Sequence, residues 1–115
     1  MVHLQNPTTG AATADFDAEL DSGAEYSLFD GDLLATVGMD LFSGDRFVFS
    51  FANGIALDAR IFQVVISHAN LGSFNLLARF STGPLRTNIL GRDFFDLLQV
   101  GFDEHRSEVY LNVSR

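Results

Sequence analysis

Short apolar runs separated by turn residues occupy most of the chain, a pattern typical of an all-β protein. Over residues 15–20, Phe, Ala and Leu alternate with Asp and Glu, and this period of two predicts a strand with one apolar face. The runs at residues 62–67 and 73–80 predict a strand pair, and those at residues 98–102 and 109–112 predict a closing hairpin.

A further hairpin is predicted in the middle of the chain. The strand-like runs at residues 46–51 and 55–60 flank Asn53 and Gly54. Asn-Gly between two such runs favours a tight turn, because both residues tolerate the positive φ that the turn requires. We therefore expect this hairpin to have its tip at Asn53 and Gly54.

Two short helices interrupt the strand pattern. Residues 32–37 change to a helical period, with Asp30 as a candidate N-cap and Gly38 as the residue that ends the helix. Residues 93–98 predict a second helix.

Length and composition indicate one small domain over residues 1–115. The 115 residues include 12 Phe, which supply bulk for a core, and no Cys, which excludes a disulfide framework and a thiolate nucleophile. The pattern does not define the role of residues 1–15, which we expect to form an N-terminal strand or loop. We read no signal peptide or membrane span from the sequence, so we expect a cytoplasmic protein with no membrane partner.

The charge of the chain argues against two classes of partner. The net charge is −8, and all 7 basic residues are Arg. Nucleic acids and anionic membranes both require clustered basic residues to displace counterions. We therefore expect no nucleic-acid partner, and we read the acidity as a contribution to solubility.

Candidate chemistry is concentrated in Asp21-Ser22-Gly23-Ala24. The three His residues stand alone, no Gly-x-Ser-x-Gly motif occurs, and no pair of His residues has metal-ligand spacing. We predict neither a metal nor a cofactor. Asp-Ser-Gly is also good turn chemistry, so the tetrapeptide alone has a purely structural alternative.

A second segment favours the catalytic interpretation. Residues 83–93 contain Gly-Pro and end in Asn88-Ile89-Leu90-Gly91-Arg92-Asp93. Together with Asp21-Ser22-Gly23, this segment resembles the retropepsin-like, or retroviral-type, aspartic proteases, and the stretch from Glu25 to Phe29 resembles their soluble bacterial relatives. The resemblance covers residues 16–112.

The resemblance implies a closed β-barrel of the acid protease type, with a flap hairpin at residues 46–60 and one or two short helices. It also implies an aspartic endopeptidase, in which a water molecule is activated between two carboxylates that share one proton. The chain contains one Asp-Ser-Gly. A working site therefore requires a homodimer in which each chain contributes Asp21.

The resemblance assigns roles to individual residues. Asp21, Ser22 and Gly23 form the catalytic turn, in which Gly23 leaves room for an extended substrate backbone. Glu25 and Arg92 are expected to form a structural ion pair, since a guanidinium can hold a carboxylate through two hydrogen bonds. The expected substrate-binding residues are Ala24, Glu19, Asn53, Gly54, Arg86, Thr87 and Ile89.

Glu19 departs from the family pattern, which has an aliphatic residue at this position. Alternation puts Glu19 on the Asp21 face, so we expect a charge in the substrate pocket that Arg86 could neutralise. The alternative function is a catalytically weak or inactive retropepsin-fold module that dimerises and binds an extended peptide by strand addition.

Overall fold

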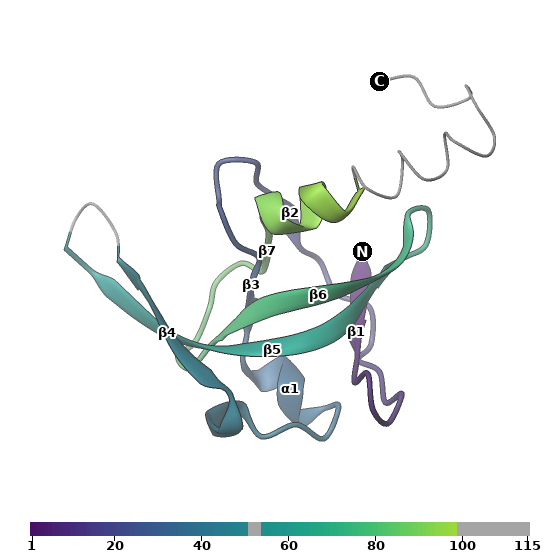
Figure 1. Ribbon diagram of the computed structural model, residues 1–115, viewed down its shortest axis with the longest axis horizontal. Coiled ribbons are helices and arrows are strands. Elements are labelled where there is room, and N and C mark those ends of the chain that lie inside the picture. Colours follow the sequence, from purple (N-terminus) through teal and green to yellow (C-terminus); the bar gives the residue numbers. More distant parts are fainter. Residues whose placement is uncertain (51–53, 99–115) are drawn as a thin grey trace.

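A single curled β-sheet dominates the structure, a computed structural model that describes residues 1–50 and 54–98 (Figure 1). The sheet has seven strands in the order β1-β5-β6-β3-β7-β2, and β4 pairs with β5 off this path. The strands are β1 Val2–Gln5, β2 Glu19–Leu20, β3 Leu28–Asp30, β4 Asp45–Ser50, β5 Ala56–His68, β6 Gly72–Ser81 and β7 Ile89–Leu90.

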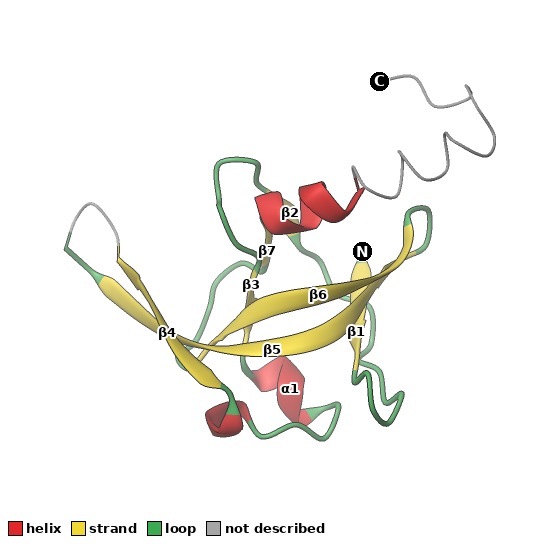
Figure 2. Cartoon of the chain, viewed as in Figure 1, coloured by secondary structure: helices red, strands yellow, loops and turns green. Residues whose placement is uncertain are grey.

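The described part also contains short helices, namely α1 Asp32–Ala35, the 3-10 helix η1 Leu41–Ser43 and a helix over residues 92–98. Figure 2 shows α1 and the helix over residues 92–98 on opposite sides of β5 and β6. The mostly β architecture agrees with the fold class predicted from the alternating pattern.

β5 is the longest strand and organises the sheet. Its first half pairs antiparallel with β4, its last four residues pair with β1, and nearly its whole length pairs with β6. The β4–β5 hairpin extends beyond the body of the molecule in Figure 1. The pairing of Ser50 with Ala56 confirms the hairpin predicted around Asn53 and Gly54, although Asn53 itself lies outside the described residues.

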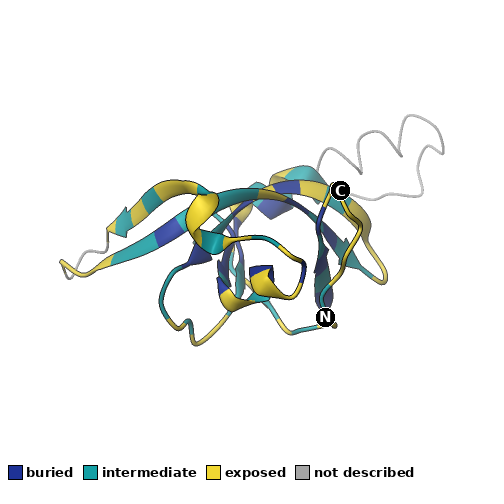
Figure 3. Cartoon of the chain, turned by 90° about the horizontal axis from the view of Figure 1, so that it is seen from below, coloured by how far each residue is buried: buried dark blue, intermediate teal, exposed yellow. Residues whose placement is uncertain are grey.

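A connected cluster of buried side chains forms the core. Phe29, Phe80 and Phe94 are fully buried there with Leu4 and Leu34. The rings of Phe29 and Phe80 lie 5.6 Å apart between centroids. Figure 3 shows the buried residues gathered within the curled body, whereas the strand β4 presents only half-buried and exposed residues.

The sheet forms a curled half-barrel rather than the closed barrel that we expected. β1 and β2 are the two ends of the strand order. An isolated bridge joins Val2 to Phe16, with N–H to oxygen distances of 2.9 and 2.8 Å in the two directions. This bridge ties β1 to the segment that leads into β2, so β1 is part of the chain's own sheet.

Several local predictions need correction. The strand expected over residues 15–20 is reduced to β2, and Leu20 is 60% exposed because β2 lies at the end of the sheet. Asp30 is not the N-cap of α1; Gly31 occupies that position, while Asp30 Oδ1 accepts a hydrogen bond from the Asp32 N–H.

The helix predicted over residues 32–37 is shorter in the structure, because α1 ends at Ala35 with Thr36 as its C-cap. Gly38, with φ +76°, ends the turn that follows the helix. The second predicted helix is confirmed over residues 92–98. Leu98 is therefore helical and does not begin a strand. The rest of the predicted closing hairpin lies outside the described residues.

Candidate active site

Asp21 lies in a tight turn directly after β2. Its N–H donates to the Leu90 carbonyl at 2.9 Å, which anchors it to β7. Its Oδ1 accepts from the Gly23 N–H at 2.9 Å, and its carbonyl accepts from the Ala24 N–H at 3.1 Å. The carboxylate is thus oriented by its own turn, as short polar side chains often are. Asp21 is half-buried, whereas Ser22 and Gly23 are exposed.

The segment that follows β7 supports this turn from behind. The Arg92 N–H donates to the Ala24 carbonyl at 2.8 Å, and the Asp93 N–H donates to the Glu25 carbonyl at 3.3 Å. A Cβ on Gly91 would lie 2.7 Å from the Tyr26 carbonyl oxygen, so a residue with a side chain would not fit without a backbone shift. The two segments that carry the sequence resemblance therefore lie side by side.

Ser27 and Asp93 form the strongest side-chain link in this region, and sequence reasoning missed it. The fully buried Ser27 hydroxyl donates to Asp93 Oδ1 at 2.6 Å and accepts from the Gly91 N–H at 3.0 Å. Both Asp93 carboxylate oxygens also accept from the Ser27 N–H, at 2.9 and 3.0 Å. The Asp21 loop is thereby fixed to the start of the helix over residues 92–98.

The predicted ion pair between Glu25 and Arg92 is not formed. Both residues are exposed and line a surface pocket with Asp96, but within the part of the chain that the structure describes they make no ion pair with each other. Asp93 provides the tether that we had expected from Arg92, because its carboxylate points back into the Asp21 loop whereas both members of the expected pair remain exposed to solvent.

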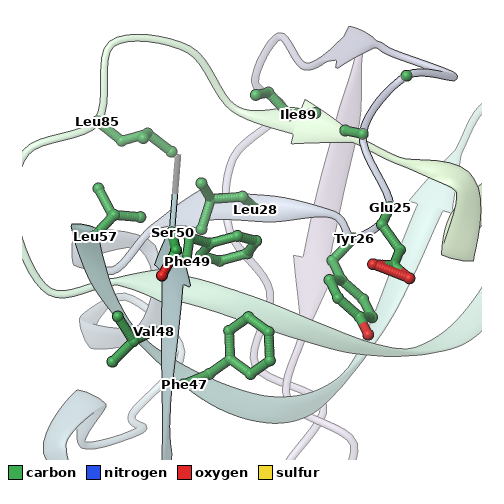
Figure 4. Close-up of a pocket in the computed structure, with 12 residues that line it drawn as sticks. Glu25, Tyr26, Leu28, Phe47, Val48, Phe49, Ser50, Leu57, Leu85 and Ile89 are labelled. Atoms are coloured by element: carbon green, nitrogen blue, oxygen red, sulfur yellow. The ribbon is translucent and has the colours of Figure 1, made fainter. Parts of the chain in front are cut away.

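An apolar pocket of about 550 Å³ opens beside the Asp21 turn (Figure 4). Three segments line it: the residues after Asp21, the β4–β5 hairpin, and residues 85–89. Figure 4 shows Phe47 and Tyr26 facing one another across the lower part of the pocket, with Leu28 above them. The lining residues are Gly23, Ala24, Glu25, Tyr26, Leu28, Phe47, Val48, Phe49, Ser50, Leu57, Leu85 and Ile89.

The expected substrate-binding residues fall into two groups. Ala24 and Ile89 line the pocket, whereas Arg86 and Thr87 are exposed outside its lining. Glu19 is also exposed and outside the lining, although it is in register with Ile89 in the parallel β2–β7 pair. Residues in register share a face, so Glu19 lies on the pocket side of the sheet, one strand farther out.

Gly54, also among the expected substrate-binding residues, is exposed near the tip of the hairpin, where it has φ +83°. The turn geometry alone therefore accounts for a glycine at this position.

Asp58 on β5 links the middle of the β4–β5 hairpin to neighbouring residues. Its carboxylate accepts from Arg46 Nε at 2.8 Å and from the Thr82 hydroxyl at 3.1 Å. Arg60 lies 3.6 Å away. The hydrogen bond from Arg46 is the main reason that the pKa of Asp58 is lowered, and desolvation opposes it. The hydrogen bond from Thr82 and the charges of both Arg residues lower the pKa by smaller amounts.

The sequence comparisons do not assign the chain to a family. No protein-family model matches the chain, and no curated protein matches it in sequence. Over residues 1–50 and 54–98, no three His, Asp or Glu side chains are grouped to hold a metal ion. In the same residues, no helix combines the length and apolar character needed to cross a bilayer.

Proposed function

We propose that the protein is an aspartic endopeptidase of the retropepsin type, which acts as a homodimer with one Asp21 from each chain. One observation carries the proposal: a half-buried Asp in an Asp-Ser-Gly turn, fixed by backbone hydrogen bonds, stands next to an apolar pocket that a β-hairpin borders. The retropepsin fold, the dimer and the activity are parts of this proposal.

The chemistry requires the second chain. In an aspartic protease two neighbouring carboxylates share one proton, because both cannot ionise at close range. The ionised Asp21 takes a proton from water as that water attacks the peptide carbonyl, and the protonated Asp21 supplies its proton to the substrate. When the tetrahedral intermediate collapses, the carboxyl that took the proton from water gives it to the leaving amine, and a hydroxyl of the intermediate returns a proton to the other Asp21. A single chain provides half of this machinery.

An extended peptide suits the surroundings of Asp21. β4 pairs with β5 alone among the described strands, so its other edge has free N–H and carbonyl groups that a peptide strand can bind. The pocket beside β4 accepts an apolar side chain. Gly23 has only the Asp21 Oδ1 near the position of an added Cβ, at 3.1 Å, so it leaves a substrate backbone room to approach.

The decisive experiment replaces the carboxylate alone. We expect Asp21→Asn to abolish cleavage of an unstructured protein while the variant remains a folded dimer, because Asn keeps the shape but neither takes nor shares a proton. Asp17→Asn, at an exposed position near the same strand, is the matched control and should retain activity. A pepstatin-type inhibitor should block the parent.

Two results would contradict the proposal. Turnover by Asp21→Asn within about tenfold of the parent would place the chemistry elsewhere, because loss of an essential acid–base group costs more. Peptide binding with no cleavage by the parent would favour the inactive binding module.

A further inference from the structure

Arg79 on β6 sits behind the aromatic wall of the pocket. Its guanidinium carbon lies 3.7 Å from the centre of the Tyr26 ring and 4.6 Å from the centre of the Phe47 ring. Both rings line the pocket, whereas Arg79 does not. A guanidinium at this range is attracted by the electron-rich faces of the rings.

The polar partners of Arg79 are few. Its Nη1 donates to the Leu77 carbonyl at 3.3 Å, and its buried Nε has no hydrogen-bond partner. Within the described residues, Arg79 makes no ion pair. The rings of Tyr26 and Phe47 are therefore the main contacts of the Arg79 guanidinium. The guanidinium and the two rings hold one another in position.

The rings that Arg79 contacts belong to segments with no backbone pairing between them. Tyr26 follows the Asp21 turn, and Phe47 lies on β4, which pairs only with β5 in the described part. Tyr26 packs edge-on against Phe47 at 5.4 Å, and Phe47 packs against Phe49 at 4.9 Å. The Arg79 N–H also donates to the Ser27 carbonyl at 3.2 Å. Arg79 thus connects the Asp21 loop to the β4–β5 hairpin.

We propose that Arg79 is a positioning residue that fixes the aromatic wall of the pocket and thereby sets its preference for a large uncharged side chain. This inference rests on the proposed function. The guanidinium already contacts both rings from behind, and its positive charge opposes a second cation in the pocket nearby. The pocket should therefore accept a Phe side chain and reject Lys.

The test compares Arg79→Met and Arg79→Lys with the parent on three extended peptides. The peptides differ only at one position, which carries Phe, Ala or Lys. This is the position at which substitution changes cleavage by the parent most. We expect Arg79→Met to raise KM for the Phe peptide about tenfold and to weaken the rejection of Lys, because the loss of a desolvated cation–π contact has this size. The value of kcat should stay within about twofold, since the chemistry is untouched. Arg79→Lys, which keeps the charge, should recover part of the loss.

The matched control is Arg60→Met. Arg60 also lies over a ring, that of Phe42, at 5.2 Å, but Phe42 is 63% exposed and does not line the pocket. Arg60 also lies 3.6 Å from Asp58, but Arg46 and Thr82 still hold Asp58 through hydrogen bonds in this variant. It should therefore keep the peptide preference of the parent.

A second measurement does not depend on cleavage. Hydrogen–deuterium exchange over residues 24–28 and 45–50 should become faster in Arg79→Met and remain unchanged in Arg60→Met. If no peptide is cleaved by the parent, the proposed function fails and exchange alone decides the role of Arg79.

Three results would overturn the inference. Unchanged exchange with unchanged KM would show that Arg79 positions nothing. A raised KM with unchanged exchange would show that Arg79 acts on substrate directly. Faster exchange with an unchanged peptide preference would limit Arg79 to a structural role. Should Arg79→Met fail to fold, Arg79→Lys decides between the same outcomes.

Discussion

Ser27 and Arg92 illustrate how differently neighbouring residues hold the candidate site. Ser27 is fully buried, and its hydroxyl satisfies Asp93 and the Gly91 N–H at once. Arg92 is exposed, and only its backbone N–H is bonded to the Asp21 loop. A buried polar group that loses its partner costs far more than an exposed side chain that is shortened.

Ser27→Ala should therefore destabilise the protein more than Arg92→Ala. Removing the Ser27 hydroxyl leaves the Gly91 N–H unsatisfied and Asp93 with fewer donors, at a cost of about 1–3 kcal/mol in the free energy of unfolding. Arg92→Ala should cost about 0.5 kcal/mol or less, as exposed substitutions usually do. Urea unfolding of both variants and the parent measures this difference. An Arg92→Ala cost larger than that of Ser27→Ala would show that Arg92 has a partner in the working assembly.

The sequence indicated two segments that the structure places side by side, but it did not indicate the contacts between them. Asp21 and the stretch that ends in Asp93 were identified from residue types and order, and the structure brings them together. The Ser27–Asp93 link depends on the pairing of β3 with β7, and the position of Arg79 depends on the register of β3 with β6. Alternation along β6 puts Arg79 on the face opposite Leu76 and Ala78, and a charged residue there is usually solvated. The sequence around Arg79 does not indicate its contacts with the rings of Tyr26 and Phe47.

Asp58 links the β4–β5 hairpin to the loop that borders the pocket. Asp58 joins Arg46 on β4 to Thr82, and the loop that follows Thr82 carries Leu85, a lining residue of the pocket. A substitution at Asp58 should therefore affect both the stability of the hairpin and the shape of the pocket.

The contribution of Asp58 to stability should disappear in acid. Its pKa in the folded protein is lower than the ordinary value of 3.8, so the unfolded chain binds the proton more readily. The stabilisation is present above pH 3.8 and is lost as the pH falls through the folded pKa. We expect Asp58→Asn to have a lower Tm than the parent at pH 7 and the same Tm at the acid end of the range.

Thermal melting between pH 2 and 7 tests this, with Asp45→Asn on β4 as the control for a change in charge. Asp45 is exposed, so its substitution should leave Tm within about a degree or two at neutral pH, as for other surface positions. A Tm difference for Asp58→Asn that is constant across the whole pH range would mean that the carboxylate charge is not what stabilises the hairpin.

The sequence predicted correctly the elements that have turn-forming residues at their ends. Asn53-Gly54 marked the hairpin, and the helix over residues 92–98 follows directly after Gly91. The continuity of β5 was not predictable in the same way. We expected separate strands at residues 55–60 and 62–67, yet no Gly, Pro or Asn lies between residues 55 and 69 to separate them. β5 stays in one piece because β4 and β1 pair with different parts of it.

Among the described residues, Asp21 lies beside an open edge of the sheet. β2 ends the strand order, and Leu20, next to Asp21, is 60% exposed. β1 is used within the chain's own sheet, so it is not free to pair with a second copy through the edge that β5 occupies. The proposed dimer therefore has to bring its two Asp21 turns together on the β2 side.

Mixing parent and inactive chains tests whether one site needs two carboxylates. When the parent and Asp21→Asn are combined in equal amounts and exchange subunits freely, about one quarter of the dimers carry two Asp21 residues. At constant total protein, activity should fall to about a quarter of that of the pure parent, because dimers with one Asp lack the shared proton. Chains that act independently would retain about half. The same mixture made with Asp17→Asn should keep the activity of the parent, since every dimer then has both carboxylates.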